Sequence, residues 1–175
     1  MIIKGEDIIL RAIEEQDCSM LKDLINDANT EEMLGGISFP ISSESQMKWF
    51  HSLCNEKNTL RLIIAKSDNP DVGIGTVILS DIDYINGNSQ IHIKLSDGQS
   101  RRHGYGTEAI RKTTEYAFNT LRLHSVWAEI VEYNEPSKRT FEKCGYKFNG
   151  ALKSRIFKKG KYWDLYVYSI QNESN

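Results

Sequence analysis

The middle of the chain constrains the fold most, because it joins a tight hairpin to a helical crossover. Asn86-Gly87 is the strongest hairpin-turn signal in the sequence, and it predicts that strands Val72–Asp83 and Ser89–Leu95 pair antiparallel. A long helical pattern, which ends near Leu121, then leads to another apolar strand, Ser125–Val131. Strands joined through such a crossover lie in one sheet. The centre of an α/β fold is therefore predicted, with a mixed sheet that contains both parallel and antiparallel strands.

The segments on either side extend this sheet. We expect a first strand, two helices, three strands, a helix, a strand, a helix and two strands, which makes about seven strands with helices on both faces. A chain of 175 residues is most simply one domain, 1–175. Outside the middle, the expected elements are a strand over Lys4–Glu14, a helix capped by Asp17, a loop or irregular helix over Asn29–Ile41, a helix from Ser43, a strand over Leu60–Lys66, a turn at Asn69-Pro70, a helix over Pro136–Lys143, and strands over Tyr146–Ile156 and Tyr162–Ile170.

The composition excludes several classes of protein. With 22 basic and 24 acidic residues the net charge is −2, so no general basic field attracts nucleic acid or a membrane surface. No apolar run approaches the roughly 20 residues that span a bilayer. The first residues turn acidic too early for a signal peptide. Cys18, Cys54 and Cys144 lack metal-like spacing. We therefore expect a cytoplasmic protein with reduced thiols and no metal.

A glycine-containing basic loop, Arg101-Arg102-His103-Gly104-Tyr105-Gly106, stands directly before the long helix. Glycines let the backbone approach a ligand closely, and a helix start offers unpaired N–H groups with a positive dipole end. The loop is therefore predicted to bind a phosphate or pyrophosphate. One alternative is a plain helix start with solvated arginines. Another is a dinucleotide fingerprint, Gly104-x-Gly106-x-x-Ala109, but eight residues separate it from the preceding strand, and it does not open the chain.

A second motif follows the strand that ends at Val131. It reads Asn134-x-x-Ser137-x-x-x-Phe141-Glu142-Lys143-x-Gly145-Tyr146. Helix capping by Asn134 and a C-terminal glycine at Gly145 explain part of it in purely structural terms. Together with the sequence GYGTEA in the loop, however, the motif resembles the GNAT superfamily of N-acetyltransferases. The opening sequence IILRAIEEQD is similar to the RimJ/RimL-like branch, which contains ribosomal-protein and spermidine N-acetyltransferases.

This resemblance implies the GNAT fold, in which two central parallel strands splay apart to hold the pantetheine arm of acetyl-CoA. Here those strands would be Ser89–Leu95 and Ser125–Val131. The implied reaction is direct attack of a primary amine on acetyl-CoA in a ternary complex, without a covalent acetyl-enzyme. The acceptor would be a protein N-terminus, a polyamine, or another small amine such as an amino sugar or amino acid. A homodimer through the final strands is possible, and neither nucleic acid nor membrane is expected as a partner.

The resemblance also assigns cofactor contacts. The backbone of the glycine loop would hold the pyrophosphate, the first splayed strand would pair with the pantetheine amides, and the second motif would line the cofactor's other side. Lys138, Arg139 and Lys143 are candidates for the outer phosphate, although such side chains are commonly solvated. The predicted cofactor residues are Ile93, Lys94, Leu95, Arg101, Arg102, His103, Gly104, Tyr105, Gly106, Thr107, Asn134, Ser137, Phe141 and Lys143.

The catalytic groups follow less directly. Many family members carry a tyrosine proton donor where this chain has Phe141, which has no proton to give. Ser137, directly or through water, is the predicted substitute, and a thiolate that leaves unaided is the alternative. Glu129 and His92 are candidates for the general base, although strand residues of both types commonly face solvent, and a water chain could do the same work.

The acceptor side is predicted from its charges. Glu31 and Glu32 would attract a cationic amine, and Tyr84 would lie near the substrate mouth. Two activities outside this reading stay open from the sequence: a catalytically silent CoA-binding module, and an NAD(P)-dependent oxidoreductase.

Overall fold

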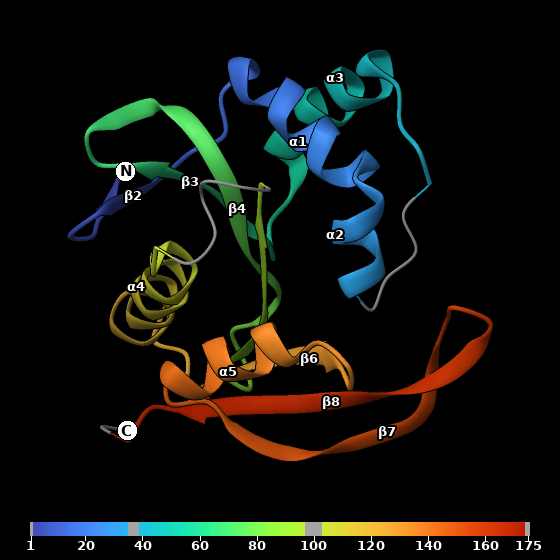
Figure 1. Cartoon of the computed structure of the whole chain (residues 1–175). Helices are drawn as coiled ribbons and strands as arrows, with labels where there is room; N and C mark the ends of the chain where they lie inside the picture. Colours follow the sequence, from blue (N-terminus) through green and yellow to red (C-terminus); the bar gives the residue numbers. More distant parts are fainter. Residues whose placement is uncertain (1, 35–38, 97–102, 174–175) are drawn as a thin grey trace.

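The computed structural model describes residues 2–34, 39–96 and 103–173, which fold around one eight-stranded sheet with the strand order β1-β2-β3-β4-β5-β6-β8-β7 (Figure 1). All neighbouring strands are antiparallel except β5 and β6, which are parallel. The strands are β1 Ile3–Lys4, β2 Ile8–Arg11, β3 Leu60–Lys66, β4 Asn69–Asp83, β5 Asn88–Leu95, β6 Ser125–Val131, β7 Lys147–Lys158 and β8 Lys161–Gln171.

The α-helices cover both faces of this sheet, as the sequence predicted. Helices α1, α2 and α3 lie on one side, and α4 and α5 lie on the other (Figure 1). Helix α4 is the crossover between the parallel strands β5 and β6. The helices are α1 Cys18–Asn26, α2 Ala28–Met33, α3 Ser43–Ser52, α4 Tyr105–Asn119 and α5 Glu135–Lys143, with short 3-10 turns at Glu15–Asp17 and Leu53–Asn55.

Two local predictions at strand ends were wrong. The expected strand Lys4–Glu14 is instead a small hairpin of β1 and β2, because the chain turns after Gly5, whose N–H donates to the carbonyl of Ile8 at 2.8 Å. The Glu108 carboxylate of α4 accepts the N–H of Glu6 and so holds this turn. The expected turn at Asn69-Pro70 is the beginning of β4, because Asn69 already pairs with Lys66.

The segment Asn29–Ile41 begins with an ordered helix, α2. The carboxylate of Asp27 caps it by accepting the N–H of Thr30 at 2.7 Å. The glycines of this segment, at positions 35 and 36, lie outside the described residues. Helix α3 begins as expected, although its cap is Ser42, whose hydroxyl accepts the N–H of Ser45 at 3.1 Å.

The core lies mainly between the sheet and α4. Ala109, Ile110 and Ala117 of α4 are fully buried against strand side chains such as Leu79 and Val126. Two alanines on this face let the helix axis approach the sheet closely. This packing fixes the start of α4, and with it the glycine loop, relative to the end of β5.

A buried ion pair connects the N-terminal segments to the sheet. Arg11, on β2, donates from both terminal nitrogens to the Asp17 carboxylate at 2.7 and 2.8 Å. Arg11 also donates to the carbonyls of Pro70 and Asp71 at the start of β4. Asp17 therefore serves mainly as the partner of Arg11 and of the Glu14 N–H, and its side chain makes no bond to the first turn of α1.

We predict that Arg11→Met lowers the free energy of unfolding by about 3–5 kcal/mol, because it leaves the Asp17 carboxylate buried without a counter-charge. Urea unfolding monitored by circular dichroism measures the change. The double variant Arg11→Met/Asp17→Leu should recover part of the loss. Lys48→Met is the control, because it breaks an exposed pair with Glu44 and should change little. Equal losses in Arg11→Met and Lys48→Met would contradict the structural role.

Candidate active site

The parallel strands β5 and β6 separate soon after they begin. They pair only over Asn88↔Ser125, Ser89↔Val126 and Gln90↔Trp127. The carbonyl of Gly87, just before β5, accepts the N–H groups of His124 and Ser125 and anchors this paired end. Beyond Gln90, β5 pairs only with β4 and β6 pairs only with β8. The predicted splay of the two central strands is present.

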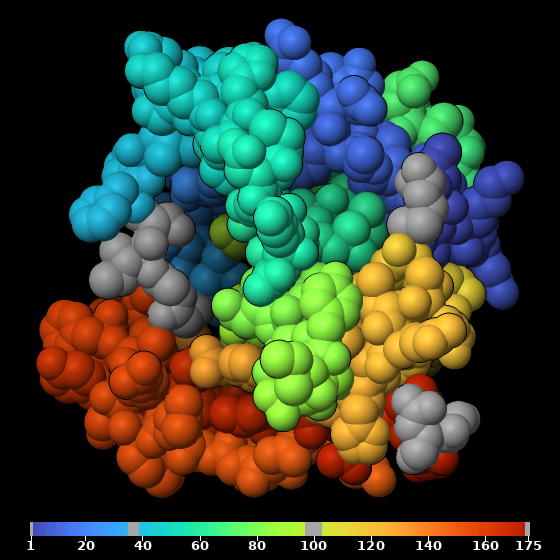
Figure 2. Space-filling view, turned by 180° about the vertical axis from the view of Figure 1, so that it is seen from behind, coloured from blue at the N-terminus to red at the C-terminus, as the bar shows by residue number. Residues whose placement is uncertain are grey.

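A cavity of about 540 Å³ lies where the two strands separate. Residues from both faces of the sheet line it, since α2 and α5 lie on opposite faces (Figure 1). The cavity therefore reaches through the sheet. From behind, the surface is hollowed between the N-terminal helices, blue to cyan, and the β7–β8 hairpin, orange to red (Figure 2). The lining residues are Met33, Leu34, Gln90, Ile91, His92, Ile93, Lys94, Ala128, Glu129, Ile130, Asn134, Ser137, Phe141, Arg155, Ile156 and Leu165.

The glycine turn at the start of α4 has the geometry of an anion site. Gly104 is the residue before the helix and has φ +86°, a left-handed conformation that favours glycine. The first helical hydrogen bond runs from the Glu108 N–H to the Gly104 carbonyl at 2.9 Å. Within the part of the chain that the structure describes, the N–H groups of residues 105–107 have no recorded acceptor. Three adjacent donors at a helix start favour a phosphate oxygen.

This turn lies beside the end of β5. A Cβ added to Gly106 would be 3.2 Å from the Leu95 side chain and 3.7 Å from that of Ile93. The ring of Tyr105 is stacked with that of His103 at 5.6 Å. The predicted loop residues Arg101 and Arg102 lie outside the described residues.

The second motif forms the start of α5 and one wall of the cavity. Asn134 caps the helix, because its Oδ1 accepts the Ser137 N–H at 3.2 Å, and its Nδ2 donates to the Met33 carbonyl at 2.8 Å. Ser137 lines the cavity, and no hydrogen-bond partner of its hydroxyl is recorded in the described chain. Phe141 is 3% exposed and packs edge-on against Tyr146, with ring centroids 5.0 Å apart. Phe141 is thus a packing residue of the cavity wall.

His92 belongs to a short hydrogen-bonded chain. The Ser80 hydroxyl donates to the Asp81 carboxylate at 3.1 Å, and His92 Nε2 lies 2.8 Å from the same hydroxyl. A Ser80 proton donated to Asp81 is compatible with the tautomer that carries its hydrogen on Nε2 and its lone pair on Nδ1. The His92 side chain is exposed at the cavity, but desolvation by the surrounding protein lowers its pKa below the usual value. Asp81 opposes this shift, and Lys94 and Arg61 add to it. The neutral ring is therefore the form present at pH 7.

The other candidate base, Glu129, also lines the cavity. It is exposed, and no ion pair or hydrogen bond of its side chain is recorded among the described residues. Glu129 lies on β6, across the split from His92 on β5. The two candidate bases therefore face one space from opposite strands.

The predicted acceptor residues lie in different places. Glu31 forms an ion pair with Lys158, and Glu32 forms one with Lys159 at 3.1 Å, so both join α2 to the β7–β8 hairpin. Tyr84 is 58% exposed in the turn before β5, at the end where β5 and β6 are still paired, and it does not line the cavity.

Lys143, predicted as a phosphate ligand, also stands apart. It does not line the cavity, and its carbonyl accepts a hydrogen bond from Arg111 at 3.0 Å.

Sequence reasoning missed three polar residues of the site: Ser80, Asp81 and Arg155. Asp81 and the neighbour of Arg155, Ser154, both have positive φ values, 52° and 50°, at irregular points of β4 and β7. Strand periodicity assigns each residue to a face, and these irregularities change the assignment. Asp81 and Ser154 are of residue types that occur in turns, but neither has an adjacent glycine or proline, so the local sequence is also compatible with a regular strand.

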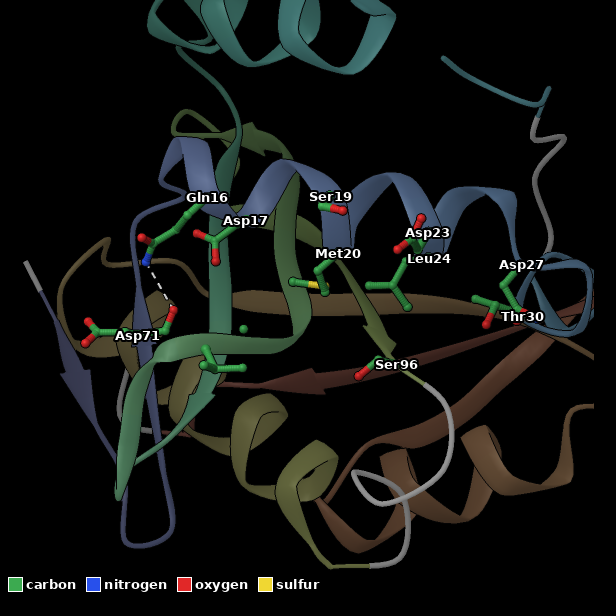
Figure 3. A pocket seen from close by; sticks show the side chains of 12 residues that line it. Gln16, Asp17, Ser19, Met20, Asp23, Leu24, Asp27, Thr30, Asp71 and Ser96 are labelled. Carbon is green, nitrogen blue, oxygen red and sulfur yellow. Dashed lines mark hydrogen bonds between the residues drawn. The ribbon is translucent and has the colours of Figure 1, made fainter. Parts of the chain in front are cut away.

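A second cavity, of about 780 Å³, lies between α1 and β4 and reaches Ser96 at the end of β5. Met20 and Leu24 point into it from α1, and Gln16 bonds to the Asp71 carbonyl at its rim (Figure 3). None of its lining residues belongs to β6 or α5. We therefore place the chemistry in the smaller cavity, which contains the inner edges of both splayed strands.

Comparison with known proteins agrees with this geometry. A family model described as an acetyltransferase (GNAT) domain matches residues 7–147. The chain belongs to the GNAT family of N-acetyltransferases. The family and the GNAT fold predicted from the sequence are thereby confirmed, and so is the class of reaction, acetylation of an amine. The RimJ/RimL-like branch stays a prediction.

Relatives align with almost the whole length of this chain. The chain is 30% identical to the SPbeta prophage-derived uncharacterized N-acetyltransferase YokL of Bacillus subtilis (strain 168), over 97% of this chain and 92% of the relative. It is 24% identical to the spermidine N(1)-acetyltransferase of Vibrio cholerae, over 97% of this chain and 96% of the relative.

Solved structures show the same fold. The V. cholerae spermidine N-acetyltransferase in complex with CoA and spermine superposes with a TM-score of 0.87 and 22% identity, covering 95% of this chain and 96% of that one. A dodecameric structure of that enzyme has a TM-score of 0.80 and 21% identity, with 95% of each chain covered. The fold also argues against the dinucleotide fingerprint, because a Rossmann domain requires a largely parallel sheet, and here only β5 and β6 are parallel.

We predict that Gly104→Ala abolishes the CoA-dependent rise in melting temperature, because alanine disfavours φ +86° and the N–H groups would turn away from the phosphate. The variant itself should lose about 1–2 kcal/mol of stability. Gly160→Ala is the matched control, since Gly160 also has a positive φ, +77°, and open space around its Cα. It should lose similar stability and keep the CoA response. Normal CoA binding by Gly104→Ala would show that the anion site lies elsewhere.

Proposed function

We propose that this acetyltransferase binds acetyl-CoA with its pyrophosphate at the start of α4 and its thioester between β5 and β6, and that a primary amine enters from the α2 side. The single observation that supports this most is the cavity at the strand split, which joins the two faces of the sheet. A linear donor held on one face can meet an acceptor from the other face only at such an opening. No metal takes part in the proposed reaction.

The backbone supplies the binding of the donor in this proposal. The N–H groups at the start of α4, which have no recorded acceptor among the described residues, take the pyrophosphate, with Arg101 and Arg102 of the same loop as further positive charge. Among the described residues, the edge of β5 that faces β6 has no strand partner over residues 91–94, and this edge can bind the pantetheine amides. A backbone N–H of the Ile93–Leu95 segment then donates to the oxyanion of the tetrahedral intermediate.

His92 is the proposed general base. An alkyl amine arrives mostly protonated at pH 7, and it must lose a proton before its nitrogen can form a bond to the thioester carbon. The neutral His92 ring offers Nδ1 for that proton, while Ser80 and Asp81 hold the opposite nitrogen. Ser80 and Asp81 are positioning residues in this scheme. Glu129, on the other strand, stabilises the ammonium form of the acceptor before transfer.

Collapse of the intermediate breaks the carbon–sulfur bond and releases the CoA thiolate. The Ser137 hydroxyl lines the cavity and is the proposed proton donor, directly or through water; departure of the free thiolate is the alternative. The cysteines do not compete as nucleophiles, because none of the three lines the cavity. Burial also raises the pKa of the Cys144 thiol to about 11, so this thiol stays protonated at neutral pH. Direct transfer in a ternary complex is therefore proposed.

Location and assembly are further parts of the proposal. We infer a cytoplasmic enzyme, supported by three free cysteines. No helix within the described ranges is long and apolar enough to cross a membrane. Self-association through the final strands is supported by exposed Phe148, Phe157 and Tyr162 on β7 and β8, and by the dodecameric assembly of the V. cholerae enzyme.

Turnover of acetyl-CoA with a panel of primary amines, read as free thiol release, tests the proposed function. We expect amine-dependent thiol release and a CoA-dependent rise in melting temperature, with no rise from NAD. CoA binding with no turnover on any amine would favour a catalytically silent CoA-binding module. Stabilisation by NAD instead of CoA would favour an oxidoreductase.

We predict that His92→Gln lowers kcat by about 10²-fold or more, and that wild-type kcat, measured at saturating acceptor, falls on the acid side with a midpoint below about 6.5. The midpoint lies low because desolvation by the surrounding protein lowers the pKa of His92. Asp81→Asn removes the one charge that raises this pKa, so the acid limb should move to lower pH. His51→Gln, at an exposed position on α3, is the control. An acid limb that persists in His92→Gln would assign the base elsewhere.

A further inference from the structure

An irregular stretch of β7 places Arg155 in the cavity. Pairing between β7 and β8 is regular from Gly150↔Val167 to Leu152↔Leu165 and resumes at Ile156↔Trp163, so β7 has extra residues between Leu152 and Ile156. Ser154 adopts φ 50° there, and its N–H donates to the Asp164 carboxylate at 2.9 Å. The irregularity leaves Arg155 among the residues that line the cavity.

Arg155 differs from three lysines of this hairpin, because no acidic partner is recorded for it among the described residues. Lys153 pairs with Asp164 at 2.6 Å, Lys158 pairs with Glu31, and Lys159 pairs with Glu32 at 3.1 Å. For Arg155, no ion pair or hydrogen bond of the side chain is recorded within residues 2–34, 39–96 and 103–173. The Arg155 guanidinium therefore lies on the cavity wall without a recorded carboxylate partner. Such a group is suited to bind an anion with two parallel hydrogen bonds.

A second cation lines the same cavity. Burial lowers the pKa of Lys94, and Arg61 lowers it further. The Lys94 ammonium has no carboxylate partner recorded in the described chain, whereas Arg61 is paired with Glu56 at 2.8 Å. An anionic group in the cavity would relieve this unfavourable environment.

The remaining polar groups of the cavity suit an amine. His92 and Glu129 provide a proton acceptor and a negative charge. The cavity therefore presents groups for an ammonium together with groups for an anion. Leu34, Ile156 and Leu165 give it an apolar part as well. A molecule that matches all three is zwitterionic and carries an apolar side chain.

We propose that the acceptor of this acetyltransferase is an amino acid or a closely similar amino-carboxylate, whose carboxylate is bound by Arg155. The proposal rests on the proposed function, since it names the acceptor for the same cavity. A polyamine is disfavoured, because each of its extra positive charges would approach Arg155 and Lys94. A protein N-terminus lacks the free α-carboxylate that Arg155 would bind.

Matched pairs of acceptors test this directly. L-Methionine, L-leucine and L-phenylalanine are compared with their α-carboxamides and with spermidine, and kcat/KM is measured by thiol release. The amides have the more acidic ammonium and so more free amine at neutral pH; without carboxylate recognition they should be the better acceptors. We expect wild type to prefer at least one acid over its amide by about tenfold or more.

Arg155→Gln should reduce this acid-to-amide ratio by about 10- to 100-fold, the range expected for a lost hydrogen bond to a charged group. Its kcat/KM for the amide should change by less than about threefold, and its CoA-dependent rise in melting temperature should persist. Lys153→Gln is the matched control, since Lys153 lies two residues away and is paired with Asp164. It should keep the wild-type ratio. An unchanged ratio in Arg155→Gln, or spermidine as the best acceptor, would overturn the inference while leaving the acetyltransferase activity established.

A binding measurement separates the two proposals if turnover is absent. N-acetyl-L-methionine and its amide are titrated by calorimetry into protein saturated with CoA. The acid should bind wild type more tightly than the amide does, and Arg155→Gln should remove the difference. Equal binding of both compounds to wild type would refute the carboxylate site. Lack of turnover on every amine, with selective binding of the acid, would contradict only the proposed function.

Discussion

The divergence of β5 and β6 is the constraint on which the rest of the structure depends. Neighbouring parallel strands normally form backbone hydrogen bonds with each other along their whole length. Here β5 and β6 are paired at only three residue pairs. The separation is sustained because each strand has an antiparallel neighbour on its outer side and the Gly87 carbonyl fixes their common end. Backbone groups and a cavity are thereby exposed at the centre of the sheet, between strands that are each paired on their outer side.

Helix ends then place binding groups around this opening. Helix α4 packs on the sheet through small buried side chains, so its first turn and Gly104 lie at the end of β5. Asn134 caps α5 and also holds the end of α2 through the Met33 carbonyl. One side chain thus couples the two faces of the sheet at the cavity. The ion pairs of Glu31 and Glu32 with the β7–β8 hairpin strengthen the same connection.

Irregular strands supply the polar chemistry. Asp81 and Ser154 both hold left-handed backbone conformations that are unfavourable for residues other than glycine. The first lies beside Ser80 and the His92 ring, and the second precedes Arg155. Hydrogen bonds compensate part of this cost at Ser154, whose N–H is bound by Asp164. Such local strain is retained where the surrounding strand pairing determines the conformation. Paired residues lie on both sides of Asp81 and of Ser154.

The sequence by itself determined the order of the elements, the Asn86-Gly87 hairpin, the crossover helix and the two motifs of the family, because turns, caps and periodicity depend on neighbours close in the chain. It also named His92, Ser137 and Phe141, which line the cavity. Only the tertiary structure decided that Glu31 and Glu32 form ion pairs with lysines more than 120 residues away, that Tyr84 lies at the closed end, and that Arg155 has no ion-pair partner among the described residues. Those outcomes depend on strand register and on which charges meet across the fold, and residues distant in the chain carry no local signal of either.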